Sequence, residues 1–87
     1  MAELKDMYHL LEQMVREAEN HEKDKVMSLE REFEELVPSV FHEQPTELEC
    51  RYDRCRQSCK MAFAQPDMYE KLISHAKTEF EKIPSPD

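Results

Sequence analysis

The chain contains no glycine among its 87 residues. Glycine is the residue that most readily supplies left-handed backbone in tight turns and helix C-caps, and it also builds phosphate-binding loops. Its absence argues against all three features, and a glycine-rich nucleotide-binding loop is close to excluded. The chain also lacks tryptophan, and its three cysteines are an odd number that leaves no complete internal disulfide framework.

Long apolar runs and targeting segments are absent as well. No apolar run approaches the length of a membrane span, and the N-terminal residues have neither the apolar centre of a signal peptide nor the arginine-rich character of a transit peptide. We therefore expect a soluble protein with no membrane insertion. Cysteines without a secretory signal are typical of reducing compartments, so the cytoplasm or the nucleus is the expected location.

Acidic residues outnumber basic ones by 20 to 12, which gives a formal net charge of -8. This acidity disfavours non-specific binding to nucleic acid. One stretch is locally basic, because Arg51, Arg54, Arg56 and Lys60 surround the single acid Asp53. We expect this basic stretch to face acidic residues of the N-terminal helix, either within the chain or in a second copy.

Residues 2–37 contain neither glycine nor proline, and their apolar residues recur at intervals of three and four. This spacing predicts one amphipathic, coiled-coil-like helix over 2–37, about 50 Å long. A chain of this size cannot cover so long a stripe by itself, so we expect the stripe to be an interface with another protein chain. The expected interface residues are Leu4, Met7, Leu11, Met14, Val26, Leu29, Phe33 and Leu36.

Prolines divide the rest of the chain. Pro38 is expected to end the first helix, because the residue before a proline resists helical backbone. Residues 38–45 then form a connector, and Thr46 with Glu49 matches a capping box that starts a second helix over 46–64. Pro66 interrupts this helix, and a third is expected over 67–82. The single helical domain is therefore 1–83, followed by a frayed tail, 84–87.

These segments define an all-α fold. The long N-terminal amphipathic helix is expected to pack antiparallel against the two shorter helices. If Pro66 only kinks the path, the chain forms a long helical hairpin. If Pro66 turns the path back, the chain forms a three-helix bundle that the first helix overhangs.

Cys50, Cys55 and Cys59 form the most distinctive chemical pattern. Cys55 and Cys59 share one face of the second helix, whereas Cys50 points away from both. With His42 they offer four potential zinc ligands, but the direction of Cys50 disfavours a shared site, so we expect no metal and no cofactor. Our main interpretation is that the thiols pack as small apolar groups, and the alternative is an oxidised or intermolecular role for these possible redox residues.

The pair Cys55-x3-Cys59 resembles the motif of helical-hairpin proteins of the mitochondrial intermembrane space. The resemblance implies two such helices joined by two disulfides, and here it covers only residues 55–59. The N-terminal helix has no cysteine, so only pairing between two chains could complete that arrangement.

No catalytic pattern stands apart from the general acidity of the chain. There is no His-Glu-x-x-His motif and no carboxylate pair at a distinctive spacing, so we do not expect an enzyme. The uncovered stripe instead favours a non-catalytic helical interaction subunit, acting as a homodimer or as a small component of a larger assembly. The alternative is a cysteine-dependent redox-linked adaptor, or a protein like the intermembrane-space hairpins.

Overall fold

The computed structural model describes residues 2–86, and within them every regular element is helical, as the sequence predicts. Met1, the first residue of the expected domain, and Asp87, the last residue of the expected tail, lie outside the described residues. The elements in chain order are α1 (Leu4–Glu19), α2 (Lys23–Val40), α3 (Glu47–Ala64), the short 3-10 helix η1 (Pro66–Met68) and α4 (Tyr69–Glu81).

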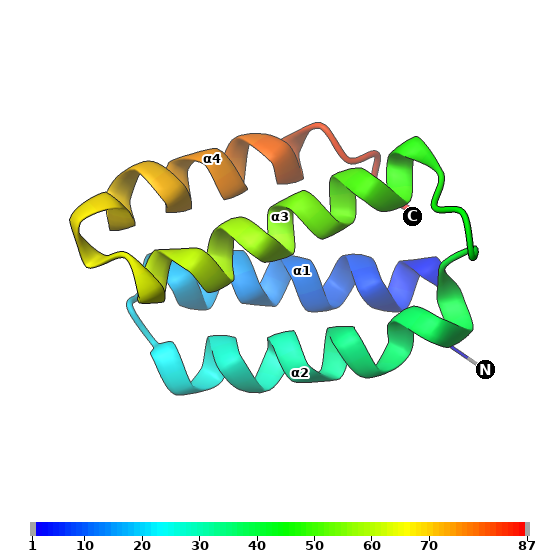
Figure 1. Ribbon diagram of the computed structural model, residues 1–87, viewed down its shortest axis with the longest axis horizontal. Coiled ribbons are helices and arrows are strands. Elements are labelled where there is room, and N and C mark those ends of the chain that lie inside the picture. Colours follow the sequence, from blue (N-terminus) through cyan, green and yellow to red (C-terminus); the bar gives the residue numbers. More distant parts are fainter. Residues whose placement is uncertain (1, 87) are drawn as a thin grey trace.

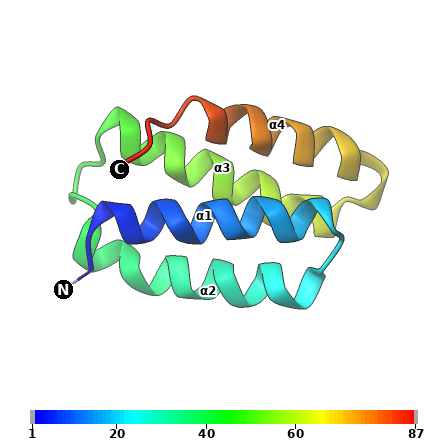
Figure 2. The same ribbon diagram turned by 180° about the vertical axis from the view of Figure 1, so that it is seen from behind.

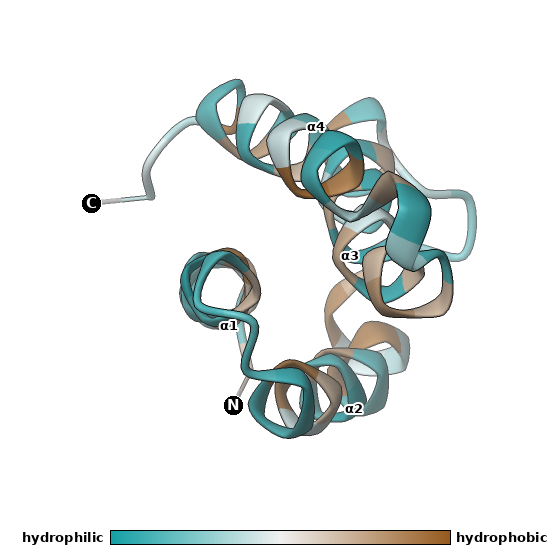
Figure 3. Ribbon diagram, turned by 90° about the vertical axis from the view of Figure 1, so that its left-hand side faces the viewer, coloured by the Kyte–Doolittle hydropathy of each residue, from teal (hydrophilic) through white to brown (hydrophobic). Residues whose placement is uncertain are grey.

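Successive helices run in opposite directions, so that α1 with α2 and α3 with α4 form two helical hairpins (Figures 1 and 2). The end-on view shows α2 and α4 at opposite corners of the bundle (Figure 3). Between them, α1 and α3 contact each other and both of the remaining helices. The bundle measures 36 × 24 × 23 Å.

The single helix expected over residues 2–37 is wrong, because the chain reverses at residues 20–22 between α1 and α2. At this turn the N–H of Glu22 donates to the carbonyl of Glu17 at 3.0 Å, and the N–H of His21 donates to that of Ala18 at 3.1 Å. This pair of bonds is the Schellman pattern, which needs one left-handed residue. His21, with a φ of 58°, supplies it. The absence of glycine therefore did not exclude a left-handed helix cap.

The reversal lets the two halves of the N-terminal stripe cover each other. Residues of α1, α2 and α3 then form one continuous core, to which α4 adds Ile73 and Ala76. The largest side chains with almost no exposed surface are Tyr52, Phe33, Met7, Leu11, Met14, Val26, Cys55 and Cys59. The chain thus covers most of the stripe that we expected a second chain to cover.

Pro38 does not end the helix that precedes it. It lies inside the last turn of α2, which continues to Val40. Proline removes one N–H donor and crowds the carbonyl four residues earlier, here that of Glu34. Only two residues of α2, Ser39 and Val40, follow Pro38, so the effect is confined to the end of the helix. The N–H of Phe41 still donates to the carbonyl of Val37 at 2.9 Å. The connector therefore begins at Phe41 rather than at residue 38.

The start of α3 has the capping box that the sequence predicts. The Thr46 hydroxyl accepts the N–H of Glu49 at 3.1 Å, and the Glu49 carboxylate accepts the N–H of Thr46 at 3.1 Å. The same carboxylate also holds the connector, since the N–H and the Nδ1 of His42 lie 3.1 and 2.8 Å from its two oxygens. At the other end of α3, Pro66 opens η1 and the path turns back, as in the second alternative, but the helix expected over 67–82 begins only at Tyr69. Neither the long hairpin nor the three-helix bundle is formed, because the segment 2–37 is itself divided into α1 and α2.

Leu10 and Leu11 test this fold directly, because they are neighbours that differ in burial. Leu11 is fully buried and Leu10 is half-buried. We expect Leu11→Ala to lower the free energy of unfolding by about 2–5 kcal/mol, since a core leucine loses both its burial and its packing. Leu10→Ala should lower it clearly less. Urea denaturation followed by circular dichroism measures both, and equal losses would contradict the hairpin.

Candidate functional site

The eight expected interface residues fall into two groups in the structure. Five of them have no exposed surface and belong to the core of the chain itself: Met7, Leu11, Met14, Val26 and Phe33. The other three are half-buried and pack against the edge of that core: Leu4, Leu29 and Leu36. Of the eight expected interface residues, only the three half-buried leucines therefore remain accessible to another chain.

Two adjoining hollows lie between α1 and α2. The first has a volume of about 450 Å³ and is lined by Gln13, Arg16, Glu17, Lys25, Ser28 and Leu29. The second has a volume of about 360 Å³ and is lined by Asp6, His9, Leu10, Gln13, Glu32, Glu35 and Leu36. Gln13 belongs to both hollows, so they form one surface, which we call the α1–α2 groove.

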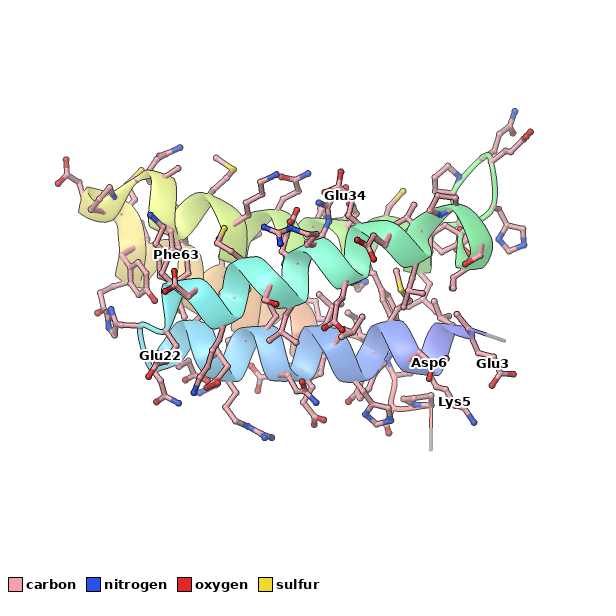
Figure 4. The ribbon with its side chains drawn as sticks, turned by 90° about the horizontal axis from the view of Figure 1, so that it is seen from below. Glu3, Lys5, Asp6, Glu22, Glu34 and Phe63 are labelled. Carbon is pink, nitrogen blue, oxygen red and sulfur yellow. The ribbon has the colours of Figure 1, made fainter. Side chains whose placement is uncertain are left out.

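Three half-buried leucines give the α1–α2 groove its apolar surface: Leu10 from α1, with Leu29 and Leu36 from α2. Figure 4 shows α2 facing the viewer with α1 beside it, and Asp6 on the first turn of α1. Leu10 escaped the sequence analysis because it lies beside the main stripe rather than on it. Its role becomes visible only once α1 and α2 are known to pack side by side.

The charges around the α1–α2 groove are mostly acidic. The hollow at Leu36 is lined by the acids Asp6, Glu32 and Glu35, and its lining has neither lysine nor arginine. The hollow at Leu29 is lined by two cationic residues, Arg16 and Lys25, and one acid, Glu17, which lies 3.5 Å from the Lys25 amine. The groove thus has one strongly acidic end.

The basic stretch of α3 is engaged within the chain. Arg56 and Lys60 reach the buried carboxylate of Glu30 on α2, at 2.9 and 3.4 Å. We expected the basic stretch to face acidic residues of the N-terminal segment, and for Arg56 and Lys60 this prediction is confirmed. Arg54 instead lies 3.2 Å from Glu79 of α4, a partner that the sequence did not indicate.

Glu79 is a buried carboxylate with several cationic partners. Burial alone raises its pKa, but hydrogen bonds and charges from Arg54 and Lys82 outweigh this effect and lower the pKa below the ordinary value of 4.5. Its ionised form therefore stabilises the folded state, and this contribution is present above the pKa of the unfolded chain. It is lost as the pH falls through the lower pKa of the folded state.

We expect Glu79→Gln to make the free energy of unfolding less dependent on pH below about pH 4.5, the ordinary pKa of a glutamate. In the unchanged protein the free energy of unfolding should fall more steeply with acidification, because Glu79 must take up a proton there. Urea denaturation at a series of pH values between neutrality and the acid range gives both curves. Glu81→Gln, on the exposed side of the same helix, is the charge-matched control and should leave the slope nearly unchanged. Equal slopes for all three chains would contradict this role of Glu79.

The three cysteines are free thiols in different surroundings. Cys55 and Cys59 are fully buried, whereas Cys50 is half-buried. The Cys55 thiol donates to the carbonyl of Ala76 at 3.4 Å. Contact with the Cys59 thiol and burial both raise the pKa of Cys55, which disfavours the reactive thiolate. No group of three or more metal-binding side chains gathers anywhere between residues 2 and 86.

These surroundings predict different thiol reactivities. In the native protein an aromatic disulfide reagent should react with Cys50, while Cys55 and Cys59 should react only when the chain unfolds, because both are buried. The rate of reaction followed by absorbance, with and without denaturant, measures this difference. Cys50→Ser should remove the native phase. Fast reaction of Cys55 or Cys59 in the native state would instead favour the redox interpretation.

A serine and a histidine also meet between α3 and α4. The hydroxyl of the buried Ser58 lies 2.9 Å from Nδ1 of His75. Sequence reasoning missed this pair because its members are 17 residues apart and no motif links them. Neither residue lines the α1–α2 groove, and the bond joins one helix of the hairpin to the other.

Comparisons with known proteins add no information about this groove. No protein-family model, no curated protein and no solved structure matches the chain. Among residues 2–86, no helix is both long enough and apolar enough to cross a membrane.

Proposed function

We propose that this chain is a non-catalytic interaction module that binds one helix of another protein in the α1–α2 groove. The observation that carries the proposal is the pair of adjoining hollows with three half-buried leucines. Apolar side chains gathered in a hollow and ringed by polar groups are typical of protein-binding surfaces. The chain acts in this proposal as a component of a larger assembly.

The shape of the groove favours a helix as its occupant. Leu29 and Leu36 are seven residues apart on α2, which corresponds to two helical turns or about 10 Å. An amphipathic helix that lies along the groove presents apolar residues at this same interval, and such helices bind grooves through positions i, i+3 or i+4, and i+7. Leu10 on α1 supplies the opposite wall.

The charge of the groove favours a basic partner. Asp6, Glu32 and Glu35 line the hollow at Leu36, so lysine or arginine beside the apolar face of the partner would complement them. A second copy of this chain is disfavoured by its overall charge, because each copy has a formal net charge of -8 and two copies repel each other. The partner at this groove is therefore a different chain.

The cysteines favour one kind of cellular compartment for this function. Three free thiols, two of them buried, support a protein that works in a reducing compartment such as the cytoplasm or nucleus. We assign no reaction to the chain and no cofactor, since the hydroxyl of Ser28 and the imidazole of His9 line different hollows of the groove and are not arranged as a nucleophile with its base.

A synthetic leucine–lysine peptide tests the groove. Its leucines follow the i, i+3, i+7 pattern of an amphipathic helix, and a second peptide of the same composition has its leucines scrambled. We expect the chain to bind the amphipathic peptide and to bind the scrambled one at least about tenfold more weakly, because only the first can bury an apolar face. Fluorescence anisotropy of the labelled peptides measures both affinities.

Variants of the chain locate the binding surface. Leu29→Asn and Leu36→Asn should each weaken binding about tenfold by removing an apolar contact. Leu72→Asn, which alters a half-buried leucine on α4, is the matched control and should leave the affinity nearly unchanged. Equal binding of both peptides, or equal losses in all three variants, would contradict the proposal.

A further inference from the structure

The turn between α1 and α2 carries backbone strain. His21 occupies the left-handed position of the Schellman pattern, with a φ of 58°. Glycine usually takes this position, because a Cβ atom clashes with the neighbouring carbonyl in left-handed backbone. The chain has no glycine to place there.

Nothing in the local sequence requires the helix to stop at this turn. Residues 19–25 read Glu-Asn-His-Glu-Lys-Asp-Lys, without glycine or proline, and all seven side chains are exposed. If the turn straightened into helix, no polar side chain of this segment would need to be buried. The hydrogen bonds of a continuous helix would replace those of the turn.

The turn is held closed by contacts with the other hairpin. The Tyr69 hydroxyl donates to the carbonyl of Ala18, and the His21 ring stacks on the Tyr69 ring with centroids 4.4 Å apart. Phe63 packs edge-on against the same tyrosine at 5.2 Å. Figure 4 shows Glu22 of the turn and Phe63 of α3 at the same end of the bundle. Tertiary contacts, rather than local sequence, therefore balance the strain at His21.

We propose that two copies of this chain exchange α1 by straightening the turn at residues 20–22 into one continuous helix. Short, strained hinges between exchangeable elements are the usual setting of such domain swapping. In the dimer, α1 of each copy packs against α2, α3 and α4 of the other copy. Its core residues find the same surroundings as in the monomer: Met7, Leu11, Met14, Val15 and Ala18.

The exchanged dimer keeps the contacts of α1 with the other helices and moves them between chains, whereas the contacts of the turn itself are lost. The Glu17–Lys25 ion pair, 3.5 Å within the monomer, joins two copies in the dimer. Each α1–α2 groove is then formed by α1 of one copy and α2 of the other. The leucine–lysine peptide is expected to bind both forms, so its binding and the exchange of α1 are separate properties.

Substitutions of His21 shift the balance between monomer and dimer in opposite directions. His21→Gly removes the ring that stacks on Tyr69, but it also relieves the left-handed strain and disfavours the continuous helix in both chains, so the dissociation constant of the dimer should rise about a hundredfold. His21→Ala keeps the strain, favours helix and removes the ring that stacks on Tyr69, so the dissociation constant should fall at least about tenfold. Sedimentation velocity over a concentration series, after refolding from denaturant, measures each constant.

A zero-length cross-link shows whether a dimer is an exchanged one. A carbodiimide joins the Glu17 carboxylate to the Lys25 amine, and chains grown in ¹⁴N and ¹⁵N are mixed before refolding. With the two kinds of chain in equal amounts, mass spectrometry should find that about half of the Glu17–Lys25 peptides from the dimer are mixed-isotope, because the chains pair at random. All such peptides from the monomer should be single-isotope. Lys25→Arg keeps the charge and should abolish the cross-link. A dimer that gives only single-isotope peptides, or equal dimer constants for the glycine and alanine variants, would overturn the proposal.

Discussion

The reversal of the chain at residues 20–22 is the constraint on which the rest of the structure depends. α1 and α2 each carry one apolar stripe, and neither can be stable in water unless that stripe is covered. Folding α1 back onto α2 buries Met7, Leu11 and Phe33 in one core. It also creates the α1–α2 groove, because Leu10, Leu29 and Leu36 lie just outside the contact between the two helices.

The packing of the helices also determines which charged residues pair with each other. Glu30 and Glu79 are buried carboxylates on α2 and α4, and the basic residues of α3 lie between them. Arg56 also covers the Phe33 ring, 5.6 Å from its centroid. Buried carboxylates need such partners, whereas exposed ion pairs contribute only about 0–1 kcal/mol each. The basic residues of α3 pair with these carboxylates, and no residue of α3 lines the α1–α2 groove, so Asp6, Glu32 and Glu35 leave its end near Leu36 acidic.

Features with a local cause were predictable from the sequence. The all-α class follows from apolar spacing, and the start of α3 follows from the reciprocal bonds of Thr46 and Glu49, which are only three residues apart. The reversal at His21 was not predictable in this way. Its stabilising contact comes from Tyr69, 51 residues from Ala18 along the chain, and the left-handed position holds a histidine instead of glycine.

The groove was not predictable for the same reason. Leu29 and Leu36 were expected at an interface, but Leu10 and the acids around it gain a role only when α1 and α2 lie side by side. The position of Pro38 misled the sequence analysis in a smaller way, since a proline in the last turn of a helix removes one hydrogen bond without ending the helix early.

Small-angle X-ray scattering from the dilute monomer tests the central claim, the folding of α1 onto α2. The account predicts a compact particle whose radius of gyration is close to that of the bundle, 12.2 Å for the Cα atoms. A continuous helix over residues 2–37 would be about 50 Å long, well beyond the longest axis of the bundle, 36 Å. An elongated, rod-like scattering profile from a sample of monomeric mass would contradict the account.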